Sequence, residues 1–525
     1  MKKADPRLGV AGLLTGFLLL TCVPSLLGQV ELVQQTDLPD DLNVEAMHLT
    51  EAQTLSLEEV TKLSVQRNLE MMKARLDQAS SSKNISIAKS IYDTRLGSNA
   101  TYTQDNQERA SVVLGDRQID SRVDFSLQKK IPLGTVLGVE AGTSRSSSNS
   151  SFSSLNKYYS SDLTFYVEQS LARNFFGYVD RKQIEQVRLD IEKFDYETLD
   201  RIENTLAEVR RQYWELIWAS ENLRIRREDL RTAQDFLQLT QDKLELGLTE
   251  KPDLYAAEAN VRQRVIGVLE AQNLLQNQSF VLKVLLNTPE VDLILPSHKI
   301  EFTPRPIEFE AELDTAFENR RDLKQAELEL KRQGIEVKIK KNQRLPDLTF
   351  EGRHSSISLD KGMASSQGEV FAYHHLKYYA GFSFSWNIEN RKERAEQQQA
   401  EFQLSKVKKE MEELKLMIMR EVDESLRNVL LAESRVSQTR EIEVLQQMKL
   451  EEELRSFNLG RSDAKTIIDY QEDLIAAESG AMRALVDHAV ALDQMHRSTH
   501  RLLEKTGIAE AEALQGEGFE GQQKP

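Results

Sequence analysis

The feature that most restricts the fold of this chain is its internal duplication. When residue n is set beside residue n+213, Glu208-Val209 falls on Glu421-Val422 and Leu246-Gly247 falls on Leu459-Gly460, without a gap. Upstream, an offset of 252 sets Leu96 on Leu348. Repetition on this scale indicates two copies of one supersecondary unit. Because 252 − 213 = 39, the first copy carries 39 additional residues between its first strand and its long helix.

Each copy is predicted to contain a helix, strands, a very long helix, a tight turn and a medium helix. The first repeat spans 50–290 and the second spans 307–508, with a proline-rich linker at 291–306. The segment 509–525 is polar and Gly-rich towards its end and is predicted to be a disordered tail. The additional residues include the Ser-rich stretch Ser144–Ser161, which either adds strands or lengthens an outer loop.

Two stretches are too long for the helices of a compact globule. Residues 180–245 and 390–458 lack both proline and glycine, and each would measure about 100 Å as one helix. A seven-residue apolar period runs along the first of them and predicts coiled-coil contact: Val209, Leu216, Leu223, Leu230, Leu237 and Leu244. The neighbouring stripe is polar, which favours a wide helical wall with one wet face. Shorter helices are predicted at about 56–92, 249–288, 309–342 and 462–506, stacked end to end in pairs.

Short segments between the helices alternate between apolar and polar residues, as half-buried strands do. They include Val123–Gln128, Leu163–Glu168, Leu348–Glu351 and Phe382–Ile388. The apolar face of such strands covers either the core of a soluble sheet or the lipid side of a β-barrel. An export signal and very long helices favour the barrel. Four to six strands in one chain are too few to close a barrel, so several copies are predicted to share it.

The N-terminus is predicted to be a signal peptide spanning 1–28. Lys2, Lys3 and Arg7 precede the apolar run Leu8–Cys22, and cleavage after Ser25 or Gly28 is compatible with the residues there. The alternatives are an uncleaved anchor helix and a lipoprotein modified at Cys22. Cys22 is the only cysteine, so a processed chain has neither disulfides nor cysteine metal sites. The net charge of −16 disfavours nucleic acid as a partner.

The sequence lacks the residue sets that are typical of enzymes. The sequence has no Gly-rich phosphate loop, no HExxH motif and no nucleophile–base set. His374-His375 could be considered as a metal pair, but it lacks nearby cysteine or a third ligand at helical spacing, so a solvated loop is the simpler interpretation. We therefore expect no enzymatic activity, no cofactor and no metal site.

The order and duplication of several motifs resemble the TolC-like outer-membrane efflux protein family. The first repeat contains VEQSLARNFFGYVDR and KLELGLTEKPDLYAAEANV, and the second contains FSFSWNIENRKERAEQQQAEFQL and RSFNLGRSDAKTIIDYQEDLIAAES. The resemblance covers about 52–507. It implies a mainly α fold with a β-barrel part. In this fold three chains share a transmembrane β-barrel and a long antiparallel α-helical barrel, and each chain contributes two internal repeats.

The resemblance also implies a function and candidate site residues. The protein would be a homotrimeric channel in the outer-membrane lipid, with its helices in the periplasm. It would serve as the passive export conduit of a tripartite efflux or type I secretion system. Gly247 and Gly460 match the tips that contact a periplasmic adaptor (membrane fusion) protein, which joins the channel to an inner-membrane pump of the RND or ABC type. Asp469 matches an acidic position at the tunnel mouth, although an ordinary solvated helix face is an equal interpretation of this residue.

Several positions depart from the family pattern near the second tip. Thr466 and Ser462 replace an expected acid and an expected arginine, with Arg461 beside the latter. Asp253, which corresponds to Thr466 in the first repeat, is a gate candidate that also suits a capping or exposed role. The alternative function is a periplasmic coiled-coil scaffold protein with a soluble sheet, in which Phe382 and Phe384 would face a protein core.

Overall fold

The computed structural model describes residues 52–108, 113, 115–150, 152–297, 300, 302, 304 and 306–515. The predicted signal peptide (1–28) with Cys22 and the end of the predicted tail, 516–525, lie outside the described residues.

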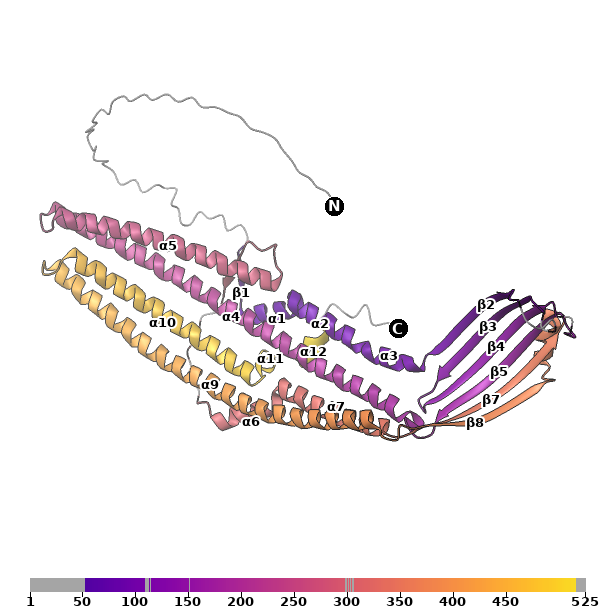
Figure 1. Cartoon of the computed structure of the whole chain (residues 1–525). Coiled ribbons are helices and arrows are strands. Elements are labelled where there is room, and N and C mark those ends of the chain that lie inside the picture. The colour runs from indigo at the N-terminus through magenta and orange to yellow at the C-terminus, as the bar shows by residue number, and fades with distance from the viewer. Residues whose placement is uncertain are drawn as a thin grey trace, which may run out of the picture. The chain divides into compact units, whose positions relative to one another are not determined.

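Two helices dominate the fold. α4 (Tyr178–Glu245) and α9 (Arg391–Asn458) have 68 residues each, which confirms the two long helices predicted from 180–245 and 390–458. After a short turn, α5 (Lys251–Leu286) runs back along α4, and α10 (Ala464–Ser498) runs back along α9 (Figure 1). The offset of 213 relates the first and last residues of α4 to those of α9.

The predicted helices at 56–92 and 309–342 are each broken, and the one predicted at 462–506 ends at Ser498, so the prediction of single helices over these three ranges is wrong. The first consists of α1 (Leu57–Arg67), α2 (Leu69–Ser82), α3 (Asn84–Lys89) and the short 3₁₀ helix η1 (Ser90–Tyr92). The second consists of α6 (Phe309–Asn319) and α7 (Arg321–Gln343). Asn68 and Arg320 take extended backbone angles at the two breaks, with ψ of 125° and 121°. The positions 68 and 320 are separated by the offset of 252.

The two breaks are held by equivalent contacts, although their side chains differ. Asn68 donates from Nδ2 to the carbonyl oxygen of Leu285 at 2.8 Å, and Arg320 donates from Nη1 to that of Ser498 at 2.9 Å. Leu285 and Ser498 are separated by the offset of 213. At each break the side chain donates to a carbonyl oxygen in the last turn of the returning helix of the hairpin, α5 or α10, so the break and its contact belong to the repeated unit.

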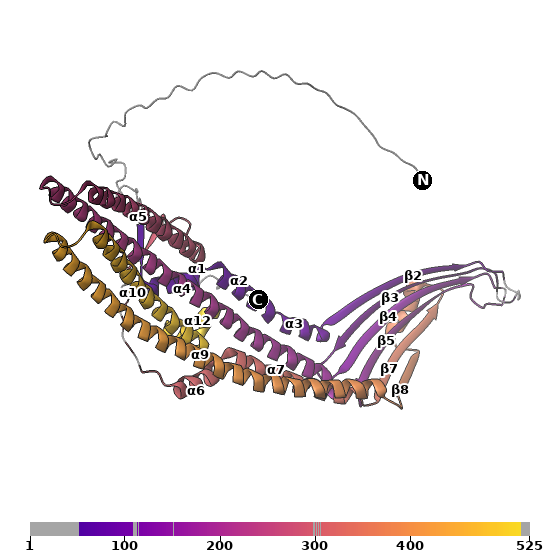
Figure 2. The same ribbon diagram turned by 60° about the vertical axis from the view of Figure 1, so that its left-hand side comes forward.

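The helices pack side by side, with shorter helices stacked end to end against the long ones (Figures 1 and 2). α4 contacts α5 and α10, and nearer the sheet it contacts α2, α3 and α7. α9 contacts α10, α6 and α7. This arrangement confirms the predicted stacking in pairs.

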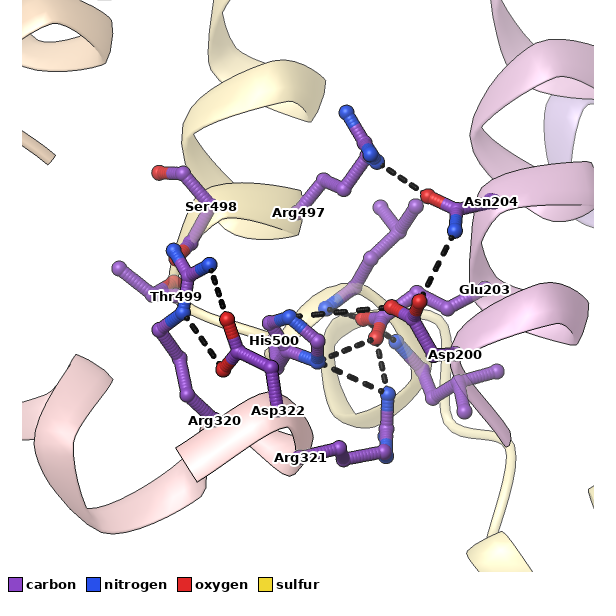
Figure 3. A network of polar contacts seen from close by, with 12 residues as sticks. Asp200, Glu203, Asn204, Arg320, Arg321, Asp322, Arg497, Ser498, Thr499 and His500 are labelled. Atoms are coloured by element: carbon purple, nitrogen blue, oxygen red, sulfur yellow. Dashed lines mark hydrogen bonds and ion pairs between the residues drawn. The ribbon is translucent and has the colours of Figure 1, made fainter. Parts of the chain in front are cut away.

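A buried polar network joins the two repeats where these stacks meet (Figure 3). Glu203 of α4 forms an ion pair with Arg321 at the start of α7, and both side chains are almost fully buried. Glu203 Oε1 also accepts from the backbone N–H of Leu502 at 2.8 Å. Burial raises the pKa of Glu203, while the Arg321 guanidinium opposes the rise. Loss of either partner would leave a buried charge without compensation, which makes this junction a fixed point of the fold.

The C-terminal segment packs beside this network. α11 (Leu502–Lys505) is followed by α12 (Glu510–Gln515), where Ala513 is fully buried and its carbonyl oxygen accepts from Arg75 Nε at 2.8 Å. The prediction of a disordered tail across 509–525 is therefore wrong for these residues. Ala513 lies in an apolar cluster with Leu503 and Ile508. The segment is too short for its apolar residues to show a helical period in the sequence, so its packing was not predicted.

Six strands form one antiparallel sheet in the order β2-β3-β4-β5-β7-β8. The strands are β2 (Thr94–Asp105), β3 (Gln118–Lys130), β4 (Thr135–Ser148), β5 (Lys157–Ser170), β7 (Asp347–Asp360) and β8 (Leu376–Ser385). The first repeat contributes four strands and the second two, so the additional residues of the first repeat add strands. β8 ends at Ser385, which leaves the last three residues of the predicted strand 382–388 outside it.

The register gives the sheet one apolar and one polar face. Leu127 pairs with Leu96 and Val139, and Val139 pairs with Phe165, so these side chains share a face. The opposite face carries ion pairs, including Arg122 with Asp162 at 3.0 Å. α8 (Met363–Phe371), in the connection from β7 to β8, packs against β5 and β7. A separate parallel pair joins β1 (Ala52–Leu55) to β6 (Leu293–Pro296) inside the predicted linker 291–306.

Candidate functional site at the hairpin tips

The two helix hairpins end in the same glycine turn. Gly247 and Gly460 have φ of +69° and +71°. In the first turn, the N–H of Leu248 donates to the Lys243 carbonyl oxygen at 2.8 Å. In the second turn, the N–H of Arg461 donates to the Ser456 carbonyl oxygen at 2.9 Å. This pattern closes a helix through a left-handed residue, which glycine provides at least cost.

Both turns present leucines to solvent. Leu246 and Leu248 flank the first glycine and are 72% and 69% exposed, and Leu459 before the second glycine is 69% exposed. A Cβ added at either glycine would have no other atom within 4 Å. The tips therefore expose apolar side chains beside a glycine that has free space around it.

The gate candidates do not form a cluster within one chain. Asp469 is on the exposed side of α10 and forms an ion pair with Lys465, one turn earlier, at 2.8 Å. Asp253 lies in the first turn of α5 and accepts from the Thr249 hydroxyl at 2.7 Å. Arg461 is exposed directly after Gly460. Among the described residues, no hydrogen bond or ion pair joins these three side chains to one another, so any shared role requires other copies of the chain.

The contacts that hold the two hairpins together near the tips involve residues that the sequence did not single out. Lys243, near the end of α4, donates from Nζ to the Phe457 carbonyl oxygen and lies 3.9 Å from the centroid of the Phe457 ring. Phe457 also packs against Phe236 with ring centroids 5.3 Å apart. Burial lowers the pKa of Lys243. The heptad pattern marks Phe457 as an apolar position, but nothing in it identifies the cation beside the ring.

Further from the tips, a buried charged group bridges three helices. Arg264 of α5 forms ion pairs with Asp229 of α4 at 3.3 Å and with Glu472 of α10 at 3.8 Å. Burial raises the pKa of Asp229 to about 6, against the opposing effect of Arg264. Beside this group, Asn260 Nδ2 donates to Gln471 Oε1 at 3.2 Å between α5 and α10. Polar side chains therefore connect the first hairpin to the second in a buried interface.

No metal-holding arrangement of three or more His, Cys, Asp or Glu side chains occurs among the described residues. His374 and His375 are exposed in the segment that precedes β8. Among the helices that the structure describes, none combines the length and apolar character needed to cross a membrane.

The fold is that of the TolC-like outer-membrane channels. The chain is similar to the CmeC outer membrane channel of Campylobacter jejuni, with a TM-score of 0.62 and 12% identity, covering 87% of this chain and 86% of the other. It is similar to the outer membrane protein VceC of Vibrio cholerae, with a TM-score of 0.63 and 14% identity, covering 86% and 96%. For the MtrE outer membrane channel of Neisseria gonorrhoeae, the TM-score is 0.61 at 15% identity, covering 84% and 88%.

Residues 313–496 match the family described as outer membrane efflux protein. This match confirms the resemblance to the TolC-like outer-membrane efflux protein family over most of the second repeat. No curated protein sequence matches the chain.

Proposed function

We propose that this chain forms the outer-membrane channel of a tripartite efflux or type I secretion system. The observation that carries the proposal is a single chain in which two 68-residue helices with apolar hairpin tips adjoin a sheet with one apolar face. The family match over 313–496 and the channel-like fold support the same function. The chain would act as a passive conduit, with energy supplied by an inner-membrane pump.

The exposed apolar side chains support a homotrimer. α9 lies at one edge of the helical layer, where Phe402 is 73% exposed and Leu445 is 63% exposed. α5 lies at the other edge, where Phe280 is 62% exposed. Burying such side chains between copies would contribute roughly 1.5–3 kcal/mol for each one that is fully covered. The two edges present different surfaces, so their contact would be heterologous, and a heterologous contact generates a ring when its rotation closes after a whole number of copies.

The apolar face of the sheet supports the placement in the membrane. Phe382, Phe384 and Phe125 are 70%, 65% and 56% exposed in one chain. We assign this face to outer-membrane lipid and the opposite, ion-paired face to the lumen of a shared β-barrel. The helices then extend into the periplasm, where the leucines beside Gly247 and Gly460 would contact a periplasmic adaptor protein. The adaptor would join the channel to an inner-membrane pump of the RND or ABC type.

The same arrangement gives Asp469 a role at the tunnel mouth. Three copies of α10 would bring three Asp469 side chains around one axis, where their carboxylates would repel one another and attract cations. Arg461 and Asp253 stand near the same tips and are secondary candidates for this gate.

Single-channel conductance in planar bilayers tests the proposal, with wild type beside Asp469→Ala. The matched control is Asp423→Ala on α9, because Asp423 also forms an ion pair one turn apart, with Arg427 at 3.0 Å, far from the tips. We expect discrete cation-selective channels whose selectivity decreases severalfold in Asp469→Ala and is unchanged in Asp423→Ala. Channels whose cation selectivity is unchanged in Asp469→Ala would contradict the gate role of Asp469 but not the proposed channel. A protein that stays in solution without detergent and forms no channels would contradict the conduit and favour the periplasmic scaffold.

A further inference from the structure

The two outer strands of the sheet end in open edges. Among the described residues, β2 and β8 each pair with a single neighbouring strand. Leu96 of β2 is 74% exposed, and Tyr378 of β8 is 73% exposed. A strand with a free edge presents unpaired N–H and C=O groups that pair readily with another chain.

The internal duplication predicts how the edge strands β8 and β2 of neighbouring copies would pair. The first strands of the repeats, β2 and β7, are related by the offset of 252, and the last strands, β5 and β8, by the offset of 213. Inside one chain, the last strand of repeat one pairs with the first strand of repeat two, as β5 with β7. The equivalent junction at the end of repeat two would pair β8 with β2 of the next copy.

Building on the proposed channel, we propose that three copies close one eighteen-stranded sheet in which β8 pairs antiparallel with β2 of the next copy, Tyr379 lying opposite Thr101. The strand number is three times the six strands that the described part of each chain contributes to this sheet. The register is obtained from the β5–β7 pair Tyr166 and Arg353 by applying the two offsets.

The side chains at this seam agree with the register. It sets Phe384 opposite Leu96, Ala380 opposite Ala100 and Tyr378 opposite Tyr102. All six residues lie on the apolar face, because Leu96 and Tyr378 are linked through successive cross-strand pairs within the chain. A shift of one residue would set this apolar face against the polar face, and the sheet could not bury either correctly.

The geometry of closure provides a second, independent check. A line across the sheet runs from Leu96 through Leu127, Val139, Phe165 and His354 to Tyr378. The proposed register continues it to Tyr102 of the next copy, which is six residues further along β2 than Leu96. Six residues of rise across six strands correspond to a strand tilt of about 35°, which lies in the range that closed barrels adopt.

The strand number sets the width of the opening. A closed sheet of eighteen strands at this tilt measures about 34 Å between opposite backbones, whereas one of twelve strands measures about 23 Å. β3 and β4 have no counterpart in the second repeat, where α8 occupies the connection between the two strands. The β3–β4 hairpin therefore converts a narrower barrel into one wide enough for an aqueous channel.

Disulfide trapping tests the seam. Opposite residues in an antiparallel ladder alternate between hydrogen-bonded and non-hydrogen-bonded pairs. Leu171 and Leu348 are a hydrogen-bonded pair, and Tyr166 lies five residues before Leu171, so Tyr166 and Arg353 form a non-hydrogen-bonded pair. The equivalent positions Tyr379 and Thr101 then lie about 4.5 Å apart between Cα atoms, which suits a disulfide. The test variant is Thr101→Cys with Tyr379→Cys. The matched controls combine Tyr379→Cys with Asn99→Cys or Thr103→Cys, two residues out of register on the same face. Single-cysteine variants report any pairing through Cys22.

We expect covalent trimers on non-reducing gels for the Thr101 pair, at roughly five times the yield of either control, because disulfides require this geometry. Strongest cross-linking in a control, or no covalent oligomer in any variant, would overturn the proposed seam. Single-channel conductance of the same variants, measured after the disulfide is reduced, tests the proposed channel separately from the proposed seam. Channels without the specific cross-link would leave the conduit intact, whereas loss of both would contradict the conduit as well.

Discussion

At the scale of single residues, the carboxyl group of Asp229 shows how a buried charge can set a pH dependence. Its side chain is 4% exposed, and Arg264, Arg226 and Glu472 are the charged groups that act on it. Burial raises its pKa from 3.8 to about 6, so the folded protein binds this proton more tightly than the unfolded chain does. The stabilising effect of protonation is therefore present at low pH and is lost as pH rises towards 6.

We expect Asp229→Asn to remove this dependence. The free energy of unfolding of wild type, minus that of the variant, should decrease by about 1–3 kcal/mol between roughly pH 4 and pH 6 and then stay constant. The measurement is unfolding of the detergent-solubilised protein by denaturant across this range. Asp423→Asn, which alters a half-exposed carboxylate, should show no such step. A difference that stays flat or increases with pH would contradict the assignment.

At the scale of the element, two glycines of the first hairpin differ in backbone conformation: one is left-handed and the other is helical. Gly247 has a φ of +69° at the turn, and a side chain there would meet no other atom. Gly267 lies inside α5, where an added Cβ would come no closer than 3.7 Å to Arg226. Space is available at both positions, so the backbone conformation alone decides the effect of a substitution.

The same change should therefore have opposite signs at the two sites. Gly247→Ala should lower the free energy of unfolding by about 1–2 kcal/mol, because an L-residue is strained in the left-handed region. Gly267→Ala should raise it by about 0.5–1 kcal/mol, because alanine restricts the unfolded chain and favours the helix. Denaturant unfolding of both variants in one detergent measures the two shifts. Equal signs would mean that the turn does not need its left-handed residue.

Sequence patterns predicted these helices well but missed their breaks. The absence of proline and glycine, together with an apolar heptad, located α4 and α9 to within a few residues. The break at Arg320 was not predicted, because arginine does not stop a helix by its own conformational preference. Asn68 is a favoured N-cap residue and accepts from the backbone N–H groups of Glu70 and Met71, but the prediction did not use this local signal. Each break is also held by a bond to a distant carbonyl, that of Leu285 or Ser498. Such a bond exists only after the helices have packed.

At the scale of the whole molecule, the β3–β4 hairpin is predicted to determine the width of the outer-membrane end. Replacing residues 106–156 by a short turn would let β2 pair directly with β5, as β7 pairs with β8 in the second repeat. We expect the diameter of the barrel to decrease from about 34 Å to about 23 Å, because three copies would then supply twelve strands. Electron microscopy of the purified trimers measures this directly. An unchanged diameter would show that the hairpin lies outside the closed sheet.

The tip residues illustrate the limit of sequence reasoning about the site. The duplication located Gly247 and Gly460, and the structure gives both the left-handed conformation that a helix-terminating glycine requires. The role of Asp469 stays a prediction, because its ion pair with Lys465 within one chain is that of an ordinary helix surface. The contact of Lys243 with Phe457 had no signal in the sequence, since it depends on how two hairpins approach each other.

The sequence alone determined the duplication, the long helices, the glycine turns and the alternation of the strands, because each depends on residues close together in the chain or on a fixed offset between copies. The breaks in the shorter helices and the packing of the C-terminal segment against the core become visible in the folded molecule alone. The same holds for the buried pair of Glu203 and Arg321, and for the strands that the additional residues of the first repeat add to the sheet. These features depend on contacts between distant segments, whose free energy comes from burial and from the pairing of polar groups that burial demands.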